Sequence, residues 1–505
     1  MKNIVIFFLL SFPLTQVFSQ QITYTQPESQ DVRNIDFEII GKIHGNFLVY
    51  KNNRSRYAVS VYDNRMDLMQ RVDLDFMPDK TLNVDFVAYP DFAYLIYQFQ
   101  KRSVLYCMAA KIDGEGNLIN KPIELDTTYI SFFADNKIYS SINSEDKSKI
   151  MIYKIQKKSD KYNFTTLLFN DSLQLLHKSR IETSYDEHRD VFSDFFVDND
   201  GNFVFAKATK SSSKDYLEDA YLITKAPESD AFDSKKLNLS GRYLDEIKLK
   251  VDNVNHHYLI NSLYYYKKRG NVEGLYTAVW NERPDELISE NFAELNDTIR
   301  ALAKTEGGLK YAFNNFFIKD VILKNDGGFI LAAEDHSTQS RGNPFNRFDY
   351  LYGSPFYSSY YNPYYFYSPS TYWYGSGYRG FYNNSQVRYY YDNIVVLNLD
   401  NKGKLIWSNV VHKSQFDDNT DNFLSYNTMI TGGELHFLFN ELERRTQLIN
   451  DQSISPDGKV TRYPPLHSLD RGYEFMPRYA KQVSSTQIIV PCSYRNYICF
   501  AKIEF

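Results

Sequence analysis

Two stretches of the chain, DGNFVFA at residues 200–206 and DGGFILA at residues 326–332, are near copies of each other. In each, an Asp-Gly pair that favours a turn leads into an aromatic and aliphatic run typical of a β-strand. A second pair, DGEGNLI at 113–119 and DNKGKLI at 400–406, has the D-x-x-G spacing of a tight hairpin. Together the two motifs predict a repeated unit of four antiparallel strands and about 50 residues, the size of a propeller blade.

Placed along the chain, this unit begins near residues 31, 82, 129, 190, 243, 314, 421 and 472. The last unit ends after its third strand, at 497–505, and a lone short strand at 22–25 would supply the fourth and remove an exposed edge. The sequence therefore predicts an all-β fold, a β-propeller of about eight four-stranded blades closed by an N-terminal strand. Seven blades and a tandem of two-sheet sandwiches are the alternatives.

The composition of the 505 residues excludes two functional classes. With 43 Tyr and 37 Phe, the chain is too rich in aromatic residues for a disordered protein. Its 57 basic and 62 acidic residues give a net charge of −5, which offers no basic field to the phosphates of a nucleic acid. General nucleic-acid binding is not expected.

The N-terminus has the pattern of a secretory signal peptide over residues 1–19. Lys2 precedes an apolar run from Ile4 to Leu14, and Val17 and Ser19 are the smaller residues expected before a cleavage site. No later segment approaches the length of an apolar transmembrane helix. We therefore expect an exported chain with one propeller domain over 20–505 and no membrane-spanning helix.

Two insertions interrupt the repeat. Residues 293–313 contain a short helical pattern that follows Asn296 and Asp297. Residues 336–391 form a Tyr-rich insertion loop, and its part from 341 to 391 holds 15 Tyr, 5 Phe and one Trp among Gly, Ser, Asn and Pro. This composition is typical of binding surfaces, and a loop this long is usually functional. The candidate binding residues are Tyr360, Tyr361, Tyr364, Tyr365, Phe366, Tyr367, Tyr372, Trp373, Tyr374 and Tyr378. A segment folded over its own propeller is one alternative, and a disordered segment is the other.

The sequence signals no catalytic or metal site. Its nine histidines form no H-x-x-x-H pair and lie at no ligand spacing from a cysteine, and there is no G-x-S-x-G elbow or P-loop. DNDG at 198–201 resembles the start of a calcium loop but lacks the later carboxylates, so a turn is expected there. We expect no metal, no cofactor and no enzymatic activity. A glycosidase pair could still be hidden, because its carboxylates need only spatial proximity.

Cys492 and Cys499 lie in a segment that predicts a hairpin turning at residues 495–496. A two-residue turn would place the two cysteines opposite each other, close to disulfide reach. A Cys492–Cys499 disulfide and two buried free thiols are equally consistent with this pattern.

The segments DGGFILA at 326–332 and NIVVLNLDNKGKLIW at 393–407 resemble repeats of secreted propellers from bacteria that carry type 9 secretion. The match covers the sixth unit best and the second and fourth less well. With a signal peptide, no cysteine for a lipid anchor and an end inside the last blade, the resemblance implies a periplasmic protein associated with the outer membrane. It also implies a non-catalytic interaction subunit of an outer-membrane complex, one that would plug the type 9 translocon barrel from the periplasmic side.

The alternative function is that of a carbohydrate-binding or glycan-processing secreted propeller. In that case, Trp373 and neighbouring Tyr residues would stack on sugar faces.

Overall fold

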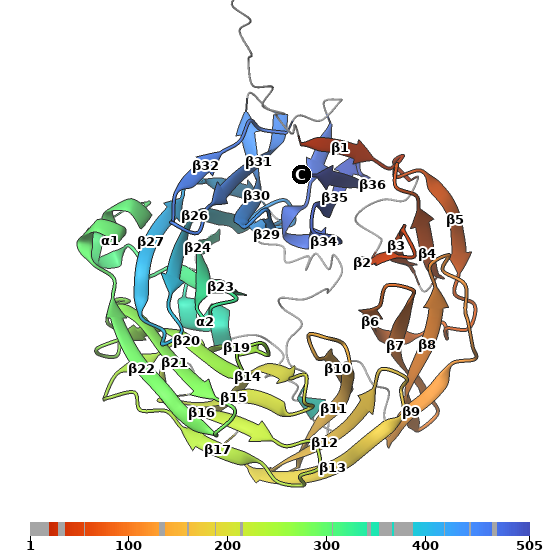
Figure 1. Ribbon diagram of the computed structural model, residues 1–505, viewed down its shortest axis with the longest axis horizontal. Helices are drawn as coiled ribbons and strands as arrows, with labels where there is room; N and C mark the ends of the chain where they lie inside the picture. The colour runs from red at the N-terminus through yellow and green to blue at the C-terminus, as the bar shows by residue number, and fades with distance from the viewer. Residues whose placement is uncertain are drawn as a thin grey trace, which may run out of the picture.

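The fold is all-β, and its sheets surround a central opening (Figure 1). The computed structural model describes residues 20–28, 36–54, 56–130, 137–158, 161–186, 188–212, 216–305, 307–340, 345–352, 366–367, 387–418, 420–443, 446–466 and 472–505. The expected signal peptide, residues 1–19, lies outside them. No helix in these ranges is long and apolar enough to cross a membrane.

Three four-stranded antiparallel sheets follow the N-terminus in chain order. The first contains β2 (Asp36–Ile43), β3 (Asn46–Asn53), β4 (Arg56–Tyr62) and β5 (Leu68–Asp73). The second contains β6 (Thr81–Ala88), β7 (Phe92–Lys101), β8 (Val104–Asp113) and β9 (Ile123–Tyr129). The third contains β10 (Ser140–Asn143), β11 (Lys149–Lys158), β12 (Lys161–Asn170) and β13 (Leu175–Ser184).

A nine-stranded sheet holds the next two repeats. Its first unit contains β14 (Asp190–Val197), β15 (Phe203–Lys210), β16 (Leu217–Lys225) and β17 (Asp233–Lys236). Its second contains β19 (Lys248–Asp252), β20 (His257–Tyr265), β21 (Gly274–Asn281) and β22 (Glu286–Glu294). The short strand β18 (Tyr243–Leu244) pairs with both β16 and β20 and thereby joins the two units.

Three further sheets complete the described chain. One contains β23 (Phe316–Leu323), β24 (Phe329–Ser340), β26 (Val387–Leu399) and β27 (Leu405–Val411), with β28 (Gln415–Asp418) paired to β26. The next contains β29 (Tyr426–Thr431), β30 (Glu434–Glu443), β31 (Thr446–Ile454) and β32 (Val460–Arg462). The last contains β33 (Tyr473–Phe475), β34 (Lys481–Gln482), β35 (Gln487–Tyr494), β36 (Tyr497–Glu504) and β1 (Gln21–Tyr24).

The four-stranded antiparallel sheets confirm the repeat that the turn motifs predict. Gly201 and Gly327 adopt φ values of 94° and 79°, a region that residues with a side chain rarely enter. In the hairpin after β8, the Asp113 carboxylate accepts hydrogen bonds from the backbone N–H groups of Glu115 and Asn117, each at 2.9 Å. The turns therefore form where the Asp and Gly residues make them favourable.

Strand β1 lies far from the rest of its sheet in sequence but beside it in space. It pairs antiparallel with β36, with Ile22 opposite Ile503. Ile503 is fully buried. The N-terminal segment thus covers the edge that β36 would otherwise expose.

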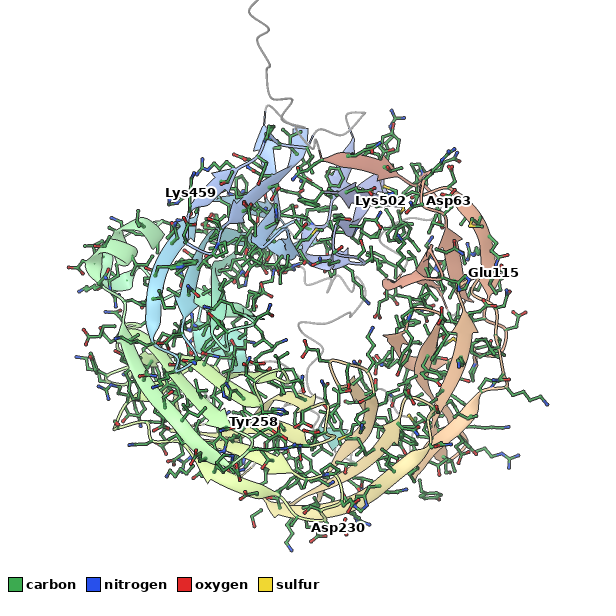
Figure 2. The ribbon with its side chains drawn as sticks, in the orientation of Figure 1. Asp63, Glu115, Asp230, Tyr258, Lys459 and Lys502 are labelled. Carbon is green, nitrogen blue, oxygen red and sulfur yellow. The ribbon has the colours of Figure 1, made fainter. Side chains whose placement is uncertain are left out.

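The core consists of apolar layers between neighbouring sheets. Leu48 and Val59 of the first sheet pack in one cluster with Leu95 and Ala110 of the second, and all four are fully or almost fully buried. Figure 2 shows side chains filling the spaces between sheets, with Glu115 and Asp230 at the outer edge. Inner strands such as β3 and β4 are buried along continuous runs of residues, because each sheet packs between two neighbours, whereas the outer strand β5 is largely exposed.

Within residues 293–313 the structure contains the helix α1 (Asp297–Ala303) and the short 3-10 helix η2 (Leu309–Tyr311). The Asn296 side chain caps α1 by accepting a hydrogen bond from the Ile299 N–H at 3.1 Å. A second 3-10 helix, η4 (Pro477–Tyr479), lies between β33 and β34.

Residues 336–340 and 387–391 of the expected insertion belong to the paired strands β24 and β26, and a short helix that packs on the fold follows β24. In α2 (Arg347–Tyr352), the Arg347 guanidinium binds the buried Asp245 carboxylate, with Nε and Nη2 at 2.7 and 2.6 Å from Oδ2. The same guanidinium lies 3.9 Å from the ring centre of Phe317. Figure 1 shows α2 beside β23, on the inner side of the ring. At least this start of the insertion is fixed to the propeller-like body.

Candidate functional site

The first strands of neighbouring sheets bring together charged groups that are far apart in sequence. Figure 1 shows β2, β6, β10 and β34 close to the central opening. Glu38 lies on β2, Asp85 on β6 and Lys481 on β34. The charges of Asp85 and Lys481 both act on the Glu38 carboxyl. We call Glu38 and Asp85 the inner carboxyl pair.

Asp85 is held by donors from its own strand and from the next sheet. Lys137 Nζ lies 3.1 Å from each carboxylate oxygen, and Ser141 Oγ donates to Oδ2 at 2.5 Å. Asn83 Nδ2 donates to Oδ1 at 2.7 Å. The Asp85 side chain is 28% exposed. A carboxylate in this setting is fixed in position and still reaches solvent.

Glu38 is in the opposite situation. Within the described part of the chain, no hydrogen bond or ion pair to its carboxyl is found, and the residue is partly exposed. Burial by the surrounding protein raises the pKa of Glu38 to about 7, and Asp85 adds to the rise while Lys481 and Lys137 oppose it. Lys481 is itself fixed by the backbone carbonyls of Ile39 and Ile40, at 2.9 and 3.1 Å from its Nζ.

The inner carboxyl pair therefore holds two carboxyl groups in different environments. Glu38 keeps its proton up to near-neutral pH, whereas the contacts of Asp85 are those of a charged carboxylate. A carboxyl group with a raised pKa near a second carboxyl group that is paired with a lysine is an arrangement typical of acid–base sites. Chemically, such a pair can give a proton to one atom while the second carboxylate stabilises or attacks another.

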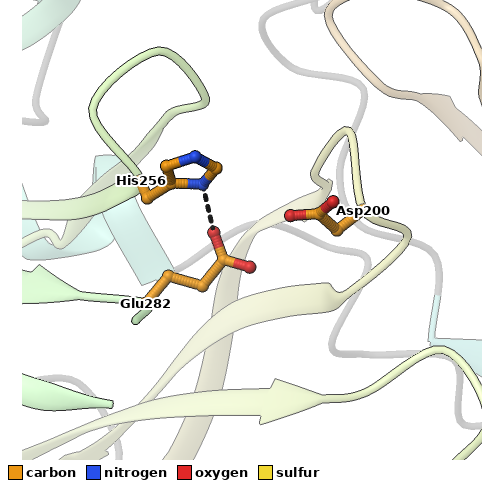
Figure 3. A group of neighbouring side chains, drawn as sticks. All are labelled: Asp200, His256 and Glu282. Atoms are coloured by element: carbon orange, nitrogen blue, oxygen red, sulfur yellow. Dashed lines mark hydrogen bonds and ion pairs between the residues drawn. The ribbon is translucent and has the colours of Figure 1, made fainter. Parts of the chain in front are cut away.

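A second cluster of titratable groups joins three turns (Figure 3). Asp200 follows β14, His256 precedes β20 and Glu282 follows β21, and their ligand atoms all lie within 4.8 Å of one another. His256 Nδ1 is 3.2 Å from Glu282 Oε2. The turn expected at 198–201 is present, with the Gly201 N–H donating to Asp198 O at 3.1 Å. The sequence did not indicate that His256 and Glu282 meet it.

Two surface hollows lie away from the inner carboxyl pair. One, of about 770 Å³, lies beside α1, and the other, of about 420 Å³, follows β17 and β18. In the larger, the Arg300 guanidinium donates to the carbonyls of Leu295 and Val272 at 2.7 and 2.9 Å, so it is occupied in holding α1. Neither Glu38 nor Asp85 lines either hollow.

Most of the candidate binding residues in the insertion lie outside the described residues: Tyr360, Tyr361, Tyr364, Tyr365, Tyr372, Trp373, Tyr374 and Tyr378. Phe366 and Tyr367 form the short strand β25 (Phe366–Tyr367), which pairs with Gln156 and Ile155 of β11. At this point and at α2, the insertion lies against its own fold, as one of the alternatives expected. Binding of a partner through the Tyr-rich segment stays a prediction.

The hairpin of β35 and β36 places Cys492 opposite Cys499, in the register that the sequence predicts. Both residues are fully buried, and their Sγ atoms are 2.6 Å apart as free thiols. Burial raises the pKa of the Cys492 thiol well above its ordinary value, which disfavours the reactive thiolate. The disulfide between them stays a prediction.

No protein-family model matches the sequence, and no curated protein matches it. Solved structures with a similar arrangement include a prolyl endopeptidase, at 9% identity and a TM-score of 0.42, matched over 92% of this chain and 55% of that one. Prolyl oligopeptidase B from Galerina marginata matches at 9% identity and a TM-score of 0.40, over 92% of this chain and 56% of its own. The polysaccharide lyase Uly1 matches at 8% identity and a TM-score of 0.37, over 83% and 89% of the two chains.

The chain spans little more than half the length of the prolyl oligopeptidases that it matches. At these identities and TM-scores the likeness transfers no activity to this chain.

These comparisons contradict the prediction of a non-catalytic interaction subunit that plugs a translocon. The solved structures named above are enzymes, and a secretion subunit is not among them. The prediction that the chain is not an enzyme is contradicted with it. The first prediction rested on the resemblance to secreted propellers and the second on the lack of a catalytic motif. Glu38 and Asp85 lie on separate repeats and come near each other only through the packing of sheets. No rule of residue spacing predicts that Glu38 and Asp85 lie near each other. The sequence shows only that each is an acidic residue on the first strand of a repeat, and that the two repeats are consecutive.

Proposed function

We propose that this chain is a glycan-processing propeller whose inner carboxyl pair hydrolyses glycosidic bonds. The observation that carries the proposal is the contrast between Glu38, whose pKa is raised to about 7, and Asp85, held by Lys137 and Ser141. Glycoside hydrolysis requires one carboxylic acid and one carboxylate on either side of the scissile bond.

In the proposed reaction, protonated Glu38 gives its proton to the glycosidic oxygen as the bond to the anomeric carbon breaks. Asp85 stabilises the positive charge that develops on the sugar, either by attacking the anomeric carbon or by taking a proton from the attacking water. If Asp85 attacks the anomeric carbon, water then displaces it from the sugar and gives a proton to the Glu38 carboxylate; if Asp85 instead takes the proton of the attacking water, it releases that proton to solvent while Glu38 takes one up from solvent. In both cases the sum is the addition of one water across the glycosidic bond. Lys137 keeps Asp85 in place through its contacts at 3.1 Å.

The proposal includes the finer architecture. The two four-stranded units of the nine-stranded sheet, together with the six other sheets, are consistent with eight blades, and the β1–β36 pairing supports closure of the ring by the N-terminal strand. A closed ring would hold first strands of different blades at fixed distances, which a two-residue site on β2 and β6 needs. We further propose that the chain is exported to the periplasm, on the basis of residues 1–19.

The test measures release of reducing ends from a panel of neutral, amino-sugar and uronate-containing polysaccharides. Glu38→Gln and Asp85→Asn should each lower the rate by about 10²–10⁴-fold on any cleaved substrate. Glu124→Gln, which changes an exposed glutamate on the outer strand β9, is the matched control and should keep the wild-type rate.

Far-ultraviolet circular dichroism establishes that each variant is folded. Wild-type rates in folded Glu38→Gln, or release of no reducing ends from any member of the panel, would contradict the proposal.

A further inference from the structure

Asp200, His256 and Glu282 converge from two different four-stranded units. Asp200 belongs to the turn between β14 and β15, whereas His256 and Glu282 belong to turns of the β19–β22 unit. Each contributes one ligand atom, and the three atoms lie within 4.8 Å of one another. The set is one imidazole nitrogen and two carboxylate oxygens (Figure 3).

One ligand-to-ligand distance is close to the value that a metal ion imposes, and the other two are at most 4.8 Å. Ligand atoms at about 2.0–2.2 Å from a tetrahedral zinc ion lie roughly 3.3–3.6 Å from each other. His256 Nδ1 and Glu282 Oε2 are 3.2 Å apart, and Asp200 and His256 are exposed. Rotations of the exposed Asp200 and His256 side chains that move their ligand atoms by about 1 Å would therefore bring the three ligands to coordination distance.

The surroundings fix one ligand and concentrate negative charge. Asn202 Nδ2 donates to Glu282 Oε1 at 2.9 Å and to Asp198 Oδ2 at 2.8 Å, which leaves Glu282 Oε2 directed at His256. Tyr258 OH also donates to Asp198 Oδ2, at 2.9 Å. Asp198 stands in the same turn as Asp200 and shares the Asn202 amide with Glu282. The three carboxyl groups thus favour a cation between them.

Arg283 provides positive charge at the cluster. Its guanidinium makes an ion pair with Asp200 and lies 3.6 Å from Glu282 Oε1. The Arg283 side chain is 61% exposed, so it can turn away into solvent. A divalent ion bound here would displace the single positive charge of the mobile Arg283 side chain and supply two positive charges at a fixed position.

We propose that Asp200, His256 and Glu282 form a binding site for a divalent transition-metal ion of the zinc type, which links two neighbouring repeats. A mixed set of imidazole and carboxylate ligands suits zinc, whereas calcium and magnesium prefer oxygen ligands alone. Arg283 competes with the ion for Asp200. This site is independent of the inner carboxyl pair.

The test titrates Zn²⁺ into the full chain, previously stripped with a chelator and dialysed, by isothermal calorimetry. We expect one site in the wild type, at least tenfold weaker binding in His256→Ala, and at least threefold tighter binding in Arg283→Gln. His177→Ala is the matched control, because His177 also lies 3.1 Å from a carboxylate, Asp230, but belongs to no such trio in the described residues. Its affinity should equal that of the wild type. Ca²⁺ should bind at least tenfold more weakly than Zn²⁺.

Equal zinc affinity in His256→Ala and the wild type, or no gain in Arg283→Gln, would overturn the proposal. Should His256→Ala fail to fold, Co²⁺ bound to the wild-type chain provides the second measurement. If Asp200, His256 and Glu282 coordinate Co²⁺ directly, the visible absorption of the bound ion differs from that of hexaaquo cobalt and changes again in Arg283→Gln. A spectrum identical to that of hexaaquo cobalt would overturn the proposal equally.

Discussion

Two glutamates on strands of different sheets, Glu38 on β2 and Glu334 on β24, have lysines as neighbours but opposite properties. Glu334 is enclosed: Lys413 Nζ lies 2.7 Å from its Oε1, Ser425 Oγ donates to its Oε2 at 2.5 Å, and Lys413 is 0% exposed. Burial alone would raise the pKa of Glu334, but Lys413 and Lys319 lower it below its ordinary value. At Glu38 burial prevails, and the pKa rises to about 7.

The difference shows what separates a structural carboxylate from a reactive one. Lys413 also donates to Tyr391 O and Gln415 Oε1, at 2.8 and 2.9 Å, so the Glu334–Lys413 ion pair is part of a hydrogen-bonded network. Such a network holds a buried carboxylate in its charged form, because a lysine and a hydroxyl replace the water that it has lost. Among the residues that the structure describes, the Glu38 carboxyl has no such partner, and it can therefore exchange its proton with a ligand.

The largest effect is expected when the enclosed network is broken. Glu334→Gln leaves the Lys413 ammonium buried without a counter-charge, and this should lower the free energy of unfolding by about 3–5 kcal/mol. Urea unfolding monitored by circular dichroism at pH 7 measures the change. Glu182→Gln, at an exposed pair with Lys161, is the control and should cause no measurable loss. A loss below about 1 kcal/mol for Glu334→Gln would show that the network is less enclosed than described.

The same substitution at Glu38 should have the opposite sign. Because its pKa is raised from 4.5 to about 7 in the folded protein, Glu38 binds its proton more tightly in the folded than in the unfolded state. Its contribution to stability is thus most favourable below pH 4.5 and falls as the pH rises to about 7. Glu38→Gln should raise the free energy of unfolding by about 1–2 kcal/mol at pH 8, with partial exposure allowed for, and by little at pH 4.5.

Urea unfolding at the two pH values measures this effect of Glu38→Gln, with Glu124→Gln as the control for an exposed glutamate. The comparison between the two glutamates fails if Glu38→Gln destabilises the protein at pH 8 as Glu334→Gln is expected to.

The smallest effect concerns the lysine beside Glu38. Lys481 lowers the pKa of Glu38, so Lys481→Gln should move the alkaline limb of the pH–rate profile to higher pH, by less than about one unit. The profile on a cleaved glycan, or the pH dependence of stability, measures the shift. Lys121→Gln, at an exposed loop position, should leave the limb in place. A shift to lower pH would contradict the placement of Lys481.

Local chemistry explains how much of the fold the sequence predicts. The Asp-Gly motifs at 200–206 and 326–332 set turns whose backbone glycine readily adopts, so the four-stranded units follow from residues close in sequence. The register of Cys492 and Cys499 is local as well, because it is set by the turn at residues 495–496. The helix after Asn296 is local for the same reason. The candidate site is different, because it depends on which repeats become neighbours and on how deeply each carboxyl is surrounded.

The Tyr-rich insertion combines a feature set by local sequence, its composition, with one set by contacts between distant residues, its position on the fold. Its composition is visible in the sequence, but its first anchor, the Arg347–Asp245 pair, joins residues separated by about a hundred positions.

By itself, the sequence determined an all-β chain of repeated antiparallel units, because turn conformation and strand alternation are properties of a few adjacent residues. Tertiary structure alone decided that Glu38 lies near Asp85 and that His256 lies near Asp200 and Glu282. It also decided that Glu334 is paired with a lysine as a carboxylate, while the pKa of Glu38 is raised. Those outcomes depend on distance and desolvation between side chains of different repeats, and neither quantity is written in the spacing of residues along the chain.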